Sequence, residues 1–210
     1  CNPLRLKRLA VMVSGGGSNL GAVISAIDRG EIQGQIALVI SSKPGVYALE
    51  RAQNAGIPTK VICKKDFASQ EAFDQANLEA LEGAQVDGVI LAGYMSIVSP
   101  QMVRRYENRI INIHPALIPS FCGMGYYGKR VHAAALEYGV KVSGATVHFV
   151  NEQADNGPII MQGVVPVLDD DTPETLAARV LEVEHTILPK SVALFCADRL
   201  KVEGRKVRTL

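Results

Sequence analysis

Short apolar runs alternate with amphipathic stretches along the first half of the chain. The apolar runs lack a polar face, which is typical of strands buried on both sides of a parallel sheet. In the stretches between them, apolar residues recur every three or four positions, and this spacing predicts helices. We expect strands at residues 9–13, 36–40, 59–62, 89–91 and 110–113, and helices at 18–29, 47–55, 69–81 and 99–106.

The second half of the chain has a different pattern. Residues 142–150 and 159–167 are two long strand candidates joined by a polar loop, which predicts an antiparallel hairpin. A helix is expected from Pro173, and Pro189 should kink or restart it before about Arg199. We therefore expect one α/β domain over residues 1–210, with an open, mostly parallel, Rossmann-like sheet, an antiparallel C-terminal hairpin and a long C-terminal helix.

Charge and cysteine content narrow the class of protein. The chain has 22 Lys and Arg and 21 Asp and Glu, a net charge of +1, so it lacks the basic surface that bulk nucleic-acid binding requires. Its four cysteines form no CxxC pair, and we expect reduced thiols in a cytoplasmic protein. The uncharged segments 9–27 and 88–103 contain glycine and serine interruptions, so we expect neither a membrane helix nor a signal peptide. Cys1 in place of a methionine suggests a trimmed or partial start.

A glycine-rich loop, Ser-Gly-Gly-Gly-Ser-Asn at 14–19, joins the first expected strand to the first helix. Backbone N–H groups in such a loop can approach a phosphate closely, and the helix N-terminus favours negative charge. The loop lacks the lysine of a P-loop. Through Gly15, Gly17 and Gly21 it also fits a loosened dinucleotide fingerprint. The alternative is a tight strand–helix turn that binds nothing.

Polar residues gather near the end of the fifth expected strand. Strand alternation puts Asn112 and His114 on one side, where an amide and an imidazole can donate hydrogen bonds to an oxyanion. His148 is a second inward candidate, and Asp155 in the following loop can hold a nearby histidine charged. Alternatively, His114 caps a turn and Asp155 only forms one. Glu184, before His185, lies either on a solvated helix face or beside the apolar stripe.

Several motifs, in order along the chain, resemble those of the phosphoribosylglycinamide formyltransferase family, which are folate-dependent enzymes of purine synthesis. They are SGGGSNL at 14–20, LAGYM at 91–95, INIHPALIPSF at 111–121 and GATVHFV at 144–150, followed by Asp155 and Gly157-Pro158. The resemblance extends over about residues 8–200. A wider superfamily of folate formyl carriers shares the Asn-x-His-Pro segment and the downstream aspartate, whereas the glycine-rich opening is more specific.

The resemblance implies a phosphate-binding half at about 8–110 and a folate and catalytic half at about 111–200. Asn112, His114 and Asp155 would be catalytic. The ribonucleotide would be bound by Gly17, Ser18, Asn19 and Glu184. The co-substrate 10-formyltetrahydrofolate would be bound by Gln70, Met95, Ser96, Ile97, Val98, Asn112, Asn151, Glu152, Gln153, Ala154 and Asp155. Gln70 and Ser96 stand where the family frequently has arginine, which puts the contacts to the folate tail in question.

The implied reaction transfers a formyl group from 10-formyltetrahydrofolate to the amine of 5-phosphoribosylglycinamide. It would use small-molecule substrates and no metal, in a monomer or weak homodimer. A formyltetrahydrofolate hydrolase is an alternative, as are an NADP-dependent reductase that uses Ser41-Ser42-Lys43 and a non-catalytic nucleotide-binding module. The hydrolase has an additional N-terminal domain, and methionyl-tRNA formyltransferase has a C-terminal one. We expect neither, because the resemblance fills nearly the whole chain.

Overall fold

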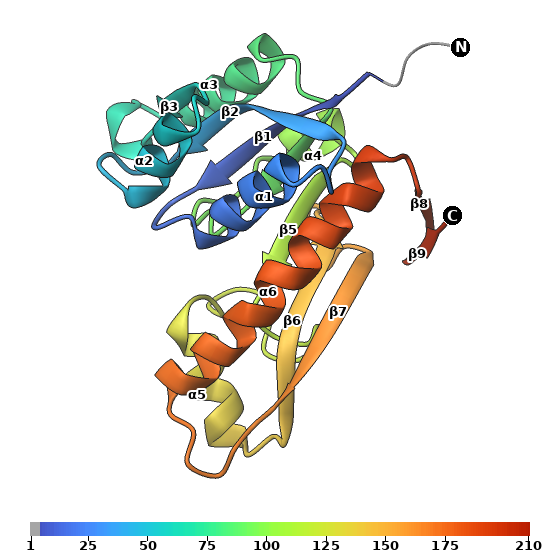
Figure 1. Cartoon of the computed structure of the whole chain (residues 1–210). Coiled ribbons are helices and arrows are strands. Elements are labelled where there is room, and N and C mark those ends of the chain that lie inside the picture. The colour runs from blue at the N-terminus through green and yellow to red at the C-terminus, as the bar shows by residue number, and fades with distance from the viewer. Residues whose placement is uncertain (1–4) are drawn as a thin grey trace.

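The computed structural model describes residues 5–210 and contains a nine-stranded sheet of order β3-β2-β1-β4-β5-β6-β7-β9-β8 (Figure 1). Its elements are β1 (Lys7–Val13), α1 (Ser18–Asp28), β2 (Gly34–Ser41), α2 (Tyr47–Asn54), β3 (Thr59–Val61), a 3-10 turn η1 (Lys64–Asp66), α3 (Gln70–Gly83), β4 (Gly88–Leu91), α4 (Pro100–Arg105), β5 (Ile110–His114), α5 (Lys129–Tyr138), β6 (Val142–Phe149), β7 (Ile159–Pro166), α6 (Pro173–Cys196), β8 (Leu200–Glu203) and β9 (Lys206–Thr209). Strands β1 to β5 pair in parallel, and β6 pairs antiparallel with both β5 and β7. The predicted fold class is confirmed.

Alternate residues of the central strands face two separate hydrophobic cores. Along β1, Leu9, Val11 and Val13 belong to one core, and Ala10 and Met12 to the other. The first core is covered by α1, α2, α5 and α6, and the second by α3 and α4. Strands buried on both faces explain why the apolar runs show no polar alternation.

Two helices begin directly after a serine whose side chain caps them. The Ser69 hydroxyl accepts the Ala72 N–H at 3.1 Å, at the start of α3. The Ser99 hydroxyl accepts the Met102 N–H at 3.1 Å, at the start of α4. Each cap satisfies one of the N–H groups that a helix start leaves without a partner.

Helix α6 differs from the expectation at Pro189. It continues as one helix through this residue to Cys196, instead of restarting there. A proline inside a helix costs about 3 kcal/mol, because it removes a backbone hydrogen bond and clashes with the preceding turn. Buried residues on both sides of Pro189, including Val180, Ile187 and Val192, pack into the first core. We infer that this burial offsets the cost.

Helix α5 and the β8–β9 hairpin were not predicted. Strand β9 meets β7 at the pair Ile159 and Lys206, and therefore extends the sheet beyond the expected hairpin. Within the described residues, Cys63, Cys122 and Cys196 carry free thiols, whereas Cys1 and the expected trimmed start lie outside them. None of the helices within residues 5–210 has both the length and the apolar character that crossing a bilayer requires.

Candidate active site

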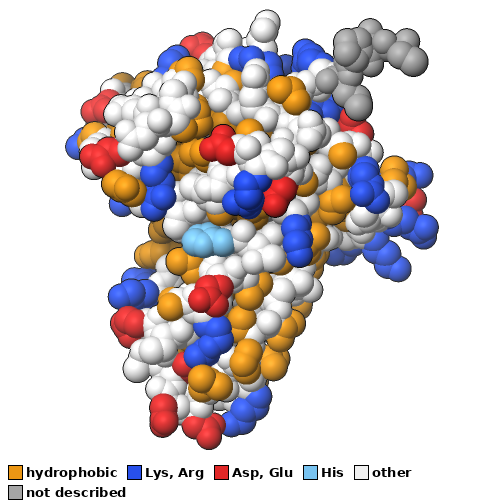
Figure 2. Space-filling view, viewed as in Figure 1, with side chains coloured by type: hydrophobic (Ala, Val, Ile, Leu, Met, Phe, Trp, Pro, Cys, Tyr) orange, Lys and Arg blue, Asp and Glu red, His pale blue; other side chains and the backbone are white. Residues whose placement is uncertain are grey.

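Three loops meet at the carboxyl end of the parallel strands. Strands β2 and β4 flank β1 on opposite sides, so the carboxyl end of β1 is a topological switch point, where open α/β sheets bind ligands. Ser14, which follows β1, joins these loops. Its hydroxyl hydrogen-bonds the Ser42 hydroxyl after β2 and accepts the Met95 N–H after β4 at 2.8 Å. Figure 2 shows a waist in the molecule, between a broad upper part and a tapering lower part.

The glycine-rich loop presents backbone N–H groups at the start of α1. Gly17 has φ 72° and ψ 34°, and this left-handed residue before a right-handed helix turns successive N–H groups toward one point. Within residues 5–210, the N–H groups of Gly17, Ser18 and Asn19 have no protein acceptor. A Cβ on Gly17 would lie 2.6 Å from Ala48 Cβ of α2. The loop therefore requires glycine at this position and has the form of an anion site.

Asn19 and Glu184 form a buried pair beside this loop. The Asn19 amide Nδ2 donates to Glu184 Oε1 at 3.2 Å, and each residue is 8% exposed. Burial raises the pKa of Glu184 to about 7, although the Asn19 hydrogen bond lowers it. Among the described residues, Asn19 Oδ1 has no partner. The solvated-face alternative for Glu184 is therefore wrong, and a buried carboxyl with a strongly shifted pKa is typical of a binding site.

Asn112 on β5 is oriented by His148, its cross-strand neighbour on β6. His148 Nδ1 donates to the Phe149 carbonyl at 2.9 Å, so the other nitrogen of the neutral ring, Nε2, is an acceptor. It accepts from Asn112 Nδ2 at 3.2 Å. Burial lowers the pKa of His148, which favours this neutral form. The second N–H of the Asn112 amide remains available to a ligand.

His114 lies on the same side of β5 as Asn112 and is 4% exposed. Its Nε2 donates to the Phe121 carbonyl at 2.8 Å, and its Nδ1 lies 3.5 Å from Asp155 Oδ2. The other carboxylate oxygen, Asp155 Oδ1, lies 3.9 Å from His148 Nε2. The structure thus brings the predicted trio together and adds His148 to it.

The loop that carries Asp155 is held in an unusual shape. Asp155 has φ 51°, and its Oδ2 accepts the Gly123 N–H at 2.9 Å from the loop that precedes α5. A Cβ on Gly157 would lie 1.6 Å from the Phe149 carbonyl oxygen, so this position also requires glycine. A residue that only forms a turn bonds its own backbone. The Asp155 carboxylate instead points toward the two histidines and a different loop.

Thr146 supports the site, and sequence reasoning did not identify it. It faces His114 across the β5–β6 pair. Its hydroxyl donates to the Ala116 carbonyl at 2.7 Å and accepts from the Ile118 N–H at 3.1 Å and from Gln162 Nε2 at 3.0 Å. These bonds fix the segment that runs from His114 to the Phe121 carbonyl. Alternation along β6 was the available signal, because it puts Thr146 on the same face as His148.

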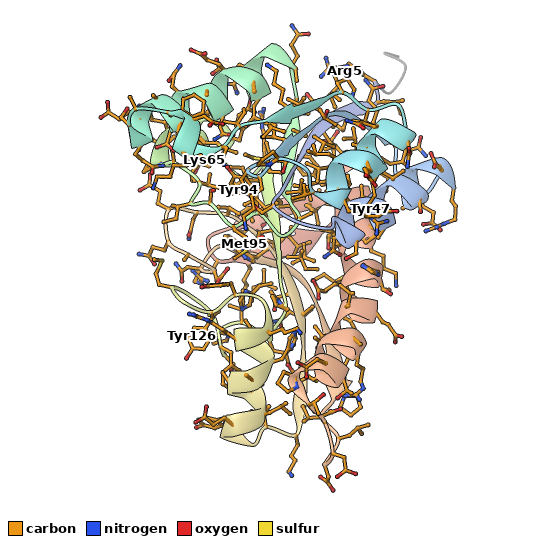
Figure 3. The ribbon with its side chains drawn as sticks, turned by 90° about the vertical axis from the view of Figure 1, so that its left-hand side faces the viewer. Arg5, Tyr47, Lys65, Tyr94, Met95 and Tyr126 are labelled. Carbon is orange, nitrogen blue, oxygen red and sulfur yellow. The ribbon has the colours of Figure 1, made fainter. Side chains whose placement is uncertain are left out.

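The first group of predicted folate residues lies on the loop after β4. Met95 is 50% and Ile97 is 72% exposed, whereas Ser96 and Val98 are half-buried. Figure 3 shows Met95 beside Tyr94 near the middle of the molecule, above Tyr126 of the loop that precedes α5. Burial raises the pKa of Tyr94 to about 12. Exposed apolar side chains that lie close together are typical of a binding surface for a flat organic molecule.

Gln70 and residues 151–155 complete the predicted folate set. Gln70 is the first residue of α3, and its Nε2 donates to Asp74 Oδ1 at 2.9 Å. Asn151 Oδ1 accepts the Gln153 N–H at 3.0 Å, which shapes the loop. The side chains that face solvent there are those of Glu152, Gln153 and Ala154. Glu152 also pairs with Arg104 of α4 at 3.3 Å, so this loop and α4 are in contact. Within residues 5–210, no group of three or more His, Cys, Asp or Glu is placed to hold a metal ion.

Comparison with known proteins agrees with this geometry. The formyl transferase family profile matches residues 7–192. The trifunctional purine biosynthetic protein adenosine-3 of Drosophila melanogaster is 47% identical over 90% of the chain, which spans 14% of that protein. The phosphoribosylglycinamide formyltransferase of Haemophilus influenzae is 39% identical, with 94% of this chain and 91% of that protein aligned. The crystal structure of glycinamide ribonucleotide transformylase 1 from Symbiobacterium toebii superposes with a TM-score of 0.93 at 45% identity, covering 98% of this chain and 95% of that one. The chain therefore belongs to the formyl transferase family, and within it to the phosphoribosylglycinamide formyltransferases.

Proposed function

We propose that the chain transfers a formyl group from 10-formyltetrahydrofolate to the amine of 5-phosphoribosylglycinamide. The observation that carries this proposal is the convergence of Asn112, His114 and Asp155 near a glycine-rich loop whose N–H groups have no acceptor among residues 5–210. The name of the Haemophilus relative supports it. The single domain, the monomer or weak homodimer and the cytoplasmic location expected from the sequence belong to the same proposal.

Asn112 and His114 would stabilise the tetrahedral oxyanion that forms when the amine attacks the formyl carbon. Asn112 has one amide N–H committed to His148 and a second N–H for the oxyanion. His114 has Nε2 committed to the Phe121 carbonyl, which leaves Nδ1 as its reactive nitrogen. One such donor lowers the barrier by ~3–4 kcal/mol in a site without bulk water. The proposed mechanism therefore uses amide and imidazolium donors and no metal ion.

Asp155 would face His114 and move the proton released by the attacking amine. The 3.5 Å between Asp155 Oδ2 and His114 Nδ1 exceeds the 2.7–2.9 Å or so of a direct charge-assisted hydrogen bond. Both groups are nevertheless close enough to contact one substrate atom or water that lies beside them. A carboxylate in this position accepts the amine proton, and the imidazolium supplies one to the leaving nitrogen of the folate.

The two substrates would occupy adjacent parts of the crevice. The N–H groups of Gly17, Ser18 and Asn19 would bind the phosphate, and Glu184 would accept from the ribose hydroxyls. The folate would lie against Met95 to Val98 and the 151–155 loop, with Gln70 at its far end. When both molecules are bound in one site, the formyl transfer becomes a unimolecular step of the ternary complex. This effect accounts for much of the expected rate acceleration.

The hydroxyls that a reductase would need are not available. Ser41 and Ser42 are buried. The Ser41 hydroxyl donates to the Lys43 carbonyl, and the Ser42 hydroxyl bonds the Ser14 hydroxyl.

A spectrophotometric assay of folate deformylation, with and without phosphoribosylglycinamide, distinguishes the remaining candidate functions. We expect deformylation only when the ribonucleotide is present. Rapid deformylation in water alone would instead identify a hydrolase, and binding without turnover would identify a nucleotide-binding module.

A further inference from the structure

Arg51 lies against the back of the glycine-rich loop, outside every set of residues assigned above. It belongs to α2, and its Nε donates to the Gly16 carbonyl at 2.9 Å. Its guanidinium carbon lies 4.7 Å from the ring centroid of Tyr47, which Figure 3 shows on the same helix. A Cβ on Gly21 would lie 2.9 Å from Arg51 Nη1, so the guanidinium occupies the space that a side chain of α1 would otherwise fill. The hydrogen bond to Gly16 and the packing on Tyr47 therefore hold one long side chain in place.

The carbonyls of all three loop glycines accept hydrogen bonds from α1 or α2. Gly15 accepts the Ala48 N–H at 3.2 Å, Gly16 accepts Arg51 Nε, and Gly17 accepts the Gly21 N–H at 2.9 Å. The N–H of a trans peptide points opposite to its carbonyl. The N–H groups that follow these carbonyls are therefore directed away from the helices, toward the anion site.

The Gly16–Gly17 peptide has no other restraint on its carbonyl among the described residues. Nothing lies within 4 Å of a Cβ built on Gly15 or Gly16, and glycine tolerates both signs of φ. Without Arg51, this peptide is free to flip. A flipped peptide would turn the Gly16 carbonyl oxygen toward a bound anion and remove the Gly17 N–H from it.

We propose that Arg51 is a positioning residue for phosphate binding: it holds the Gly16–Gly17 peptide so that the Gly17 N–H faces the phosphate of the substrate. This inference rests on the proposed function, which supplies the phosphorylated substrate. The partial exposure of Arg51 and its fixed planar donor suit this task better than a lysine, whose ammonium has no preferred direction.

Arg51→Met tests the proposal, because methionine keeps an unbranched stem but has neither the charge nor the donor. We expect KM for phosphoribosylglycinamide to rise about tenfold, the loss typical of one well-made hydrogen bond, with kcat within about twofold of the unaltered protein. With glycinamide riboside, which lacks the phosphate, KM should be the same in both proteins. Arg51→Lys, which keeps the charge, should behave like Arg51→Met.

Arg29→Met is the matched control, since Arg29 lies at the other end of α1 and pairs with Glu31 at the surface. It makes the same change in net charge and should leave both KM values unchanged. Gly21→Ala is a second route to the same effect, because it displaces the Arg51 guanidinium without removing it. It should raise KM for the ribonucleotide and add nothing further in the Arg51→Met background.

Three results would overturn the proposal: an unchanged KM for the ribonucleotide in Arg51→Met, an equal rise in KM for the riboside, or full recovery in Arg51→Lys. Binding of ribose 5-phosphate by calorimetry provides a test that does not depend on catalysis. The affinity should fall about tenfold in Arg51→Met and stay unchanged in Arg29→Met. If the protein transfers no formyl group, this binding result still decides the role of Arg51. A failure of the proposed function can therefore be told apart from a failure of the Arg51 proposal.

Discussion

Replacing Glu184 by glutamine tests whether the protein keeps a buried carboxylate for binding at a cost in stability. Burial raises the pKa of Glu184 from 4.5 to about 7. This shift means that folding favours the protonated over the ionised carboxyl by a free energy of ~3 kcal/mol. The folded pKa is the higher one, so protonated Glu184 favours folding. That contribution is fully present below pH 4.5 and is lost as the pH rises through about 7.

Glutamine has the shape of the protonated carboxyl but does not titrate. It can accept from Asn19 Nδ2, and Asn19 Oδ1, which has no partner among residues 5–210, can accept from its amide. We expect Glu184→Gln to be more stable than the unaltered protein by up to ~3 kcal/mol at pH 8 and by much less at pH 5. Its affinity for the ribonucleotide should fall, because an amide is a weaker acceptor than a carboxylate for ribose hydroxyls.

Urea unfolding at pH 5 and pH 8, with linear extrapolation, measures this difference. Glu182→Gln is the control, since Glu182 is exposed on the same helix and should show no such pH dependence. A stability difference between Glu184→Gln and the unaltered protein that is the same at both pH values would refute the reasoning. So would a Glu184→Gln variant that is less stable at pH 8.

Three further substitutions test other parts of the site. Gly17→Ala combines an unfavourable φ of 72° with a Cβ 2.6 Å from Ala48, so we expect a loss of at least about 1–2 kcal/mol in urea unfolding and weaker ribonucleotide binding by calorimetry. Asp155→Asn removes the proton acceptor beside His114 and should lower kcat by about 10²-fold or more, while ribonucleotide binding by calorimetry stays unchanged. Thr146→Val leaves the Ile118 N–H without its acceptor, so we expect a loss of ~1–3 kcal/mol in unfolding and a lower kcat, whereas retained activity would show that the segment after His114 needs no such support.

Much of the fold could be predicted because burial on both faces leaves a clear sequence pattern. The strand cores of β1, β2 and β4 are uninterrupted apolar runs, and serine caps locate the starts of α3 and α4. Helix α5 lacked such a signal, since Gly128 precedes it without a side-chain cap. The outcome at Pro189 depended on tertiary packing around α6, which local propensity does not contain.

The site was predictable where side chains act and unpredictable where the backbone does. Strand alternation places Asn112 and His114 on one side, and the structure agrees. The Phe121 carbonyl that holds His114 and the Gly16 carbonyl that holds Arg51 are backbone groups, which every residue type supplies. The exact partner of such a group depends on loop conformation, so composition and spacing give no indication of it.

The central claim is tested most directly by following a carbon-13 formyl group from labelled 10-formyltetrahydrofolate in the presence of phosphoribosylglycinamide. The account predicts that mass spectrometry will find one label on the ribonucleotide product for each folate consumed, and that Asn112→Ala will slow its appearance at every pH because an amide does not titrate. Label recovered as free formate, at a rate that the ribonucleotide does not change, would contradict the account.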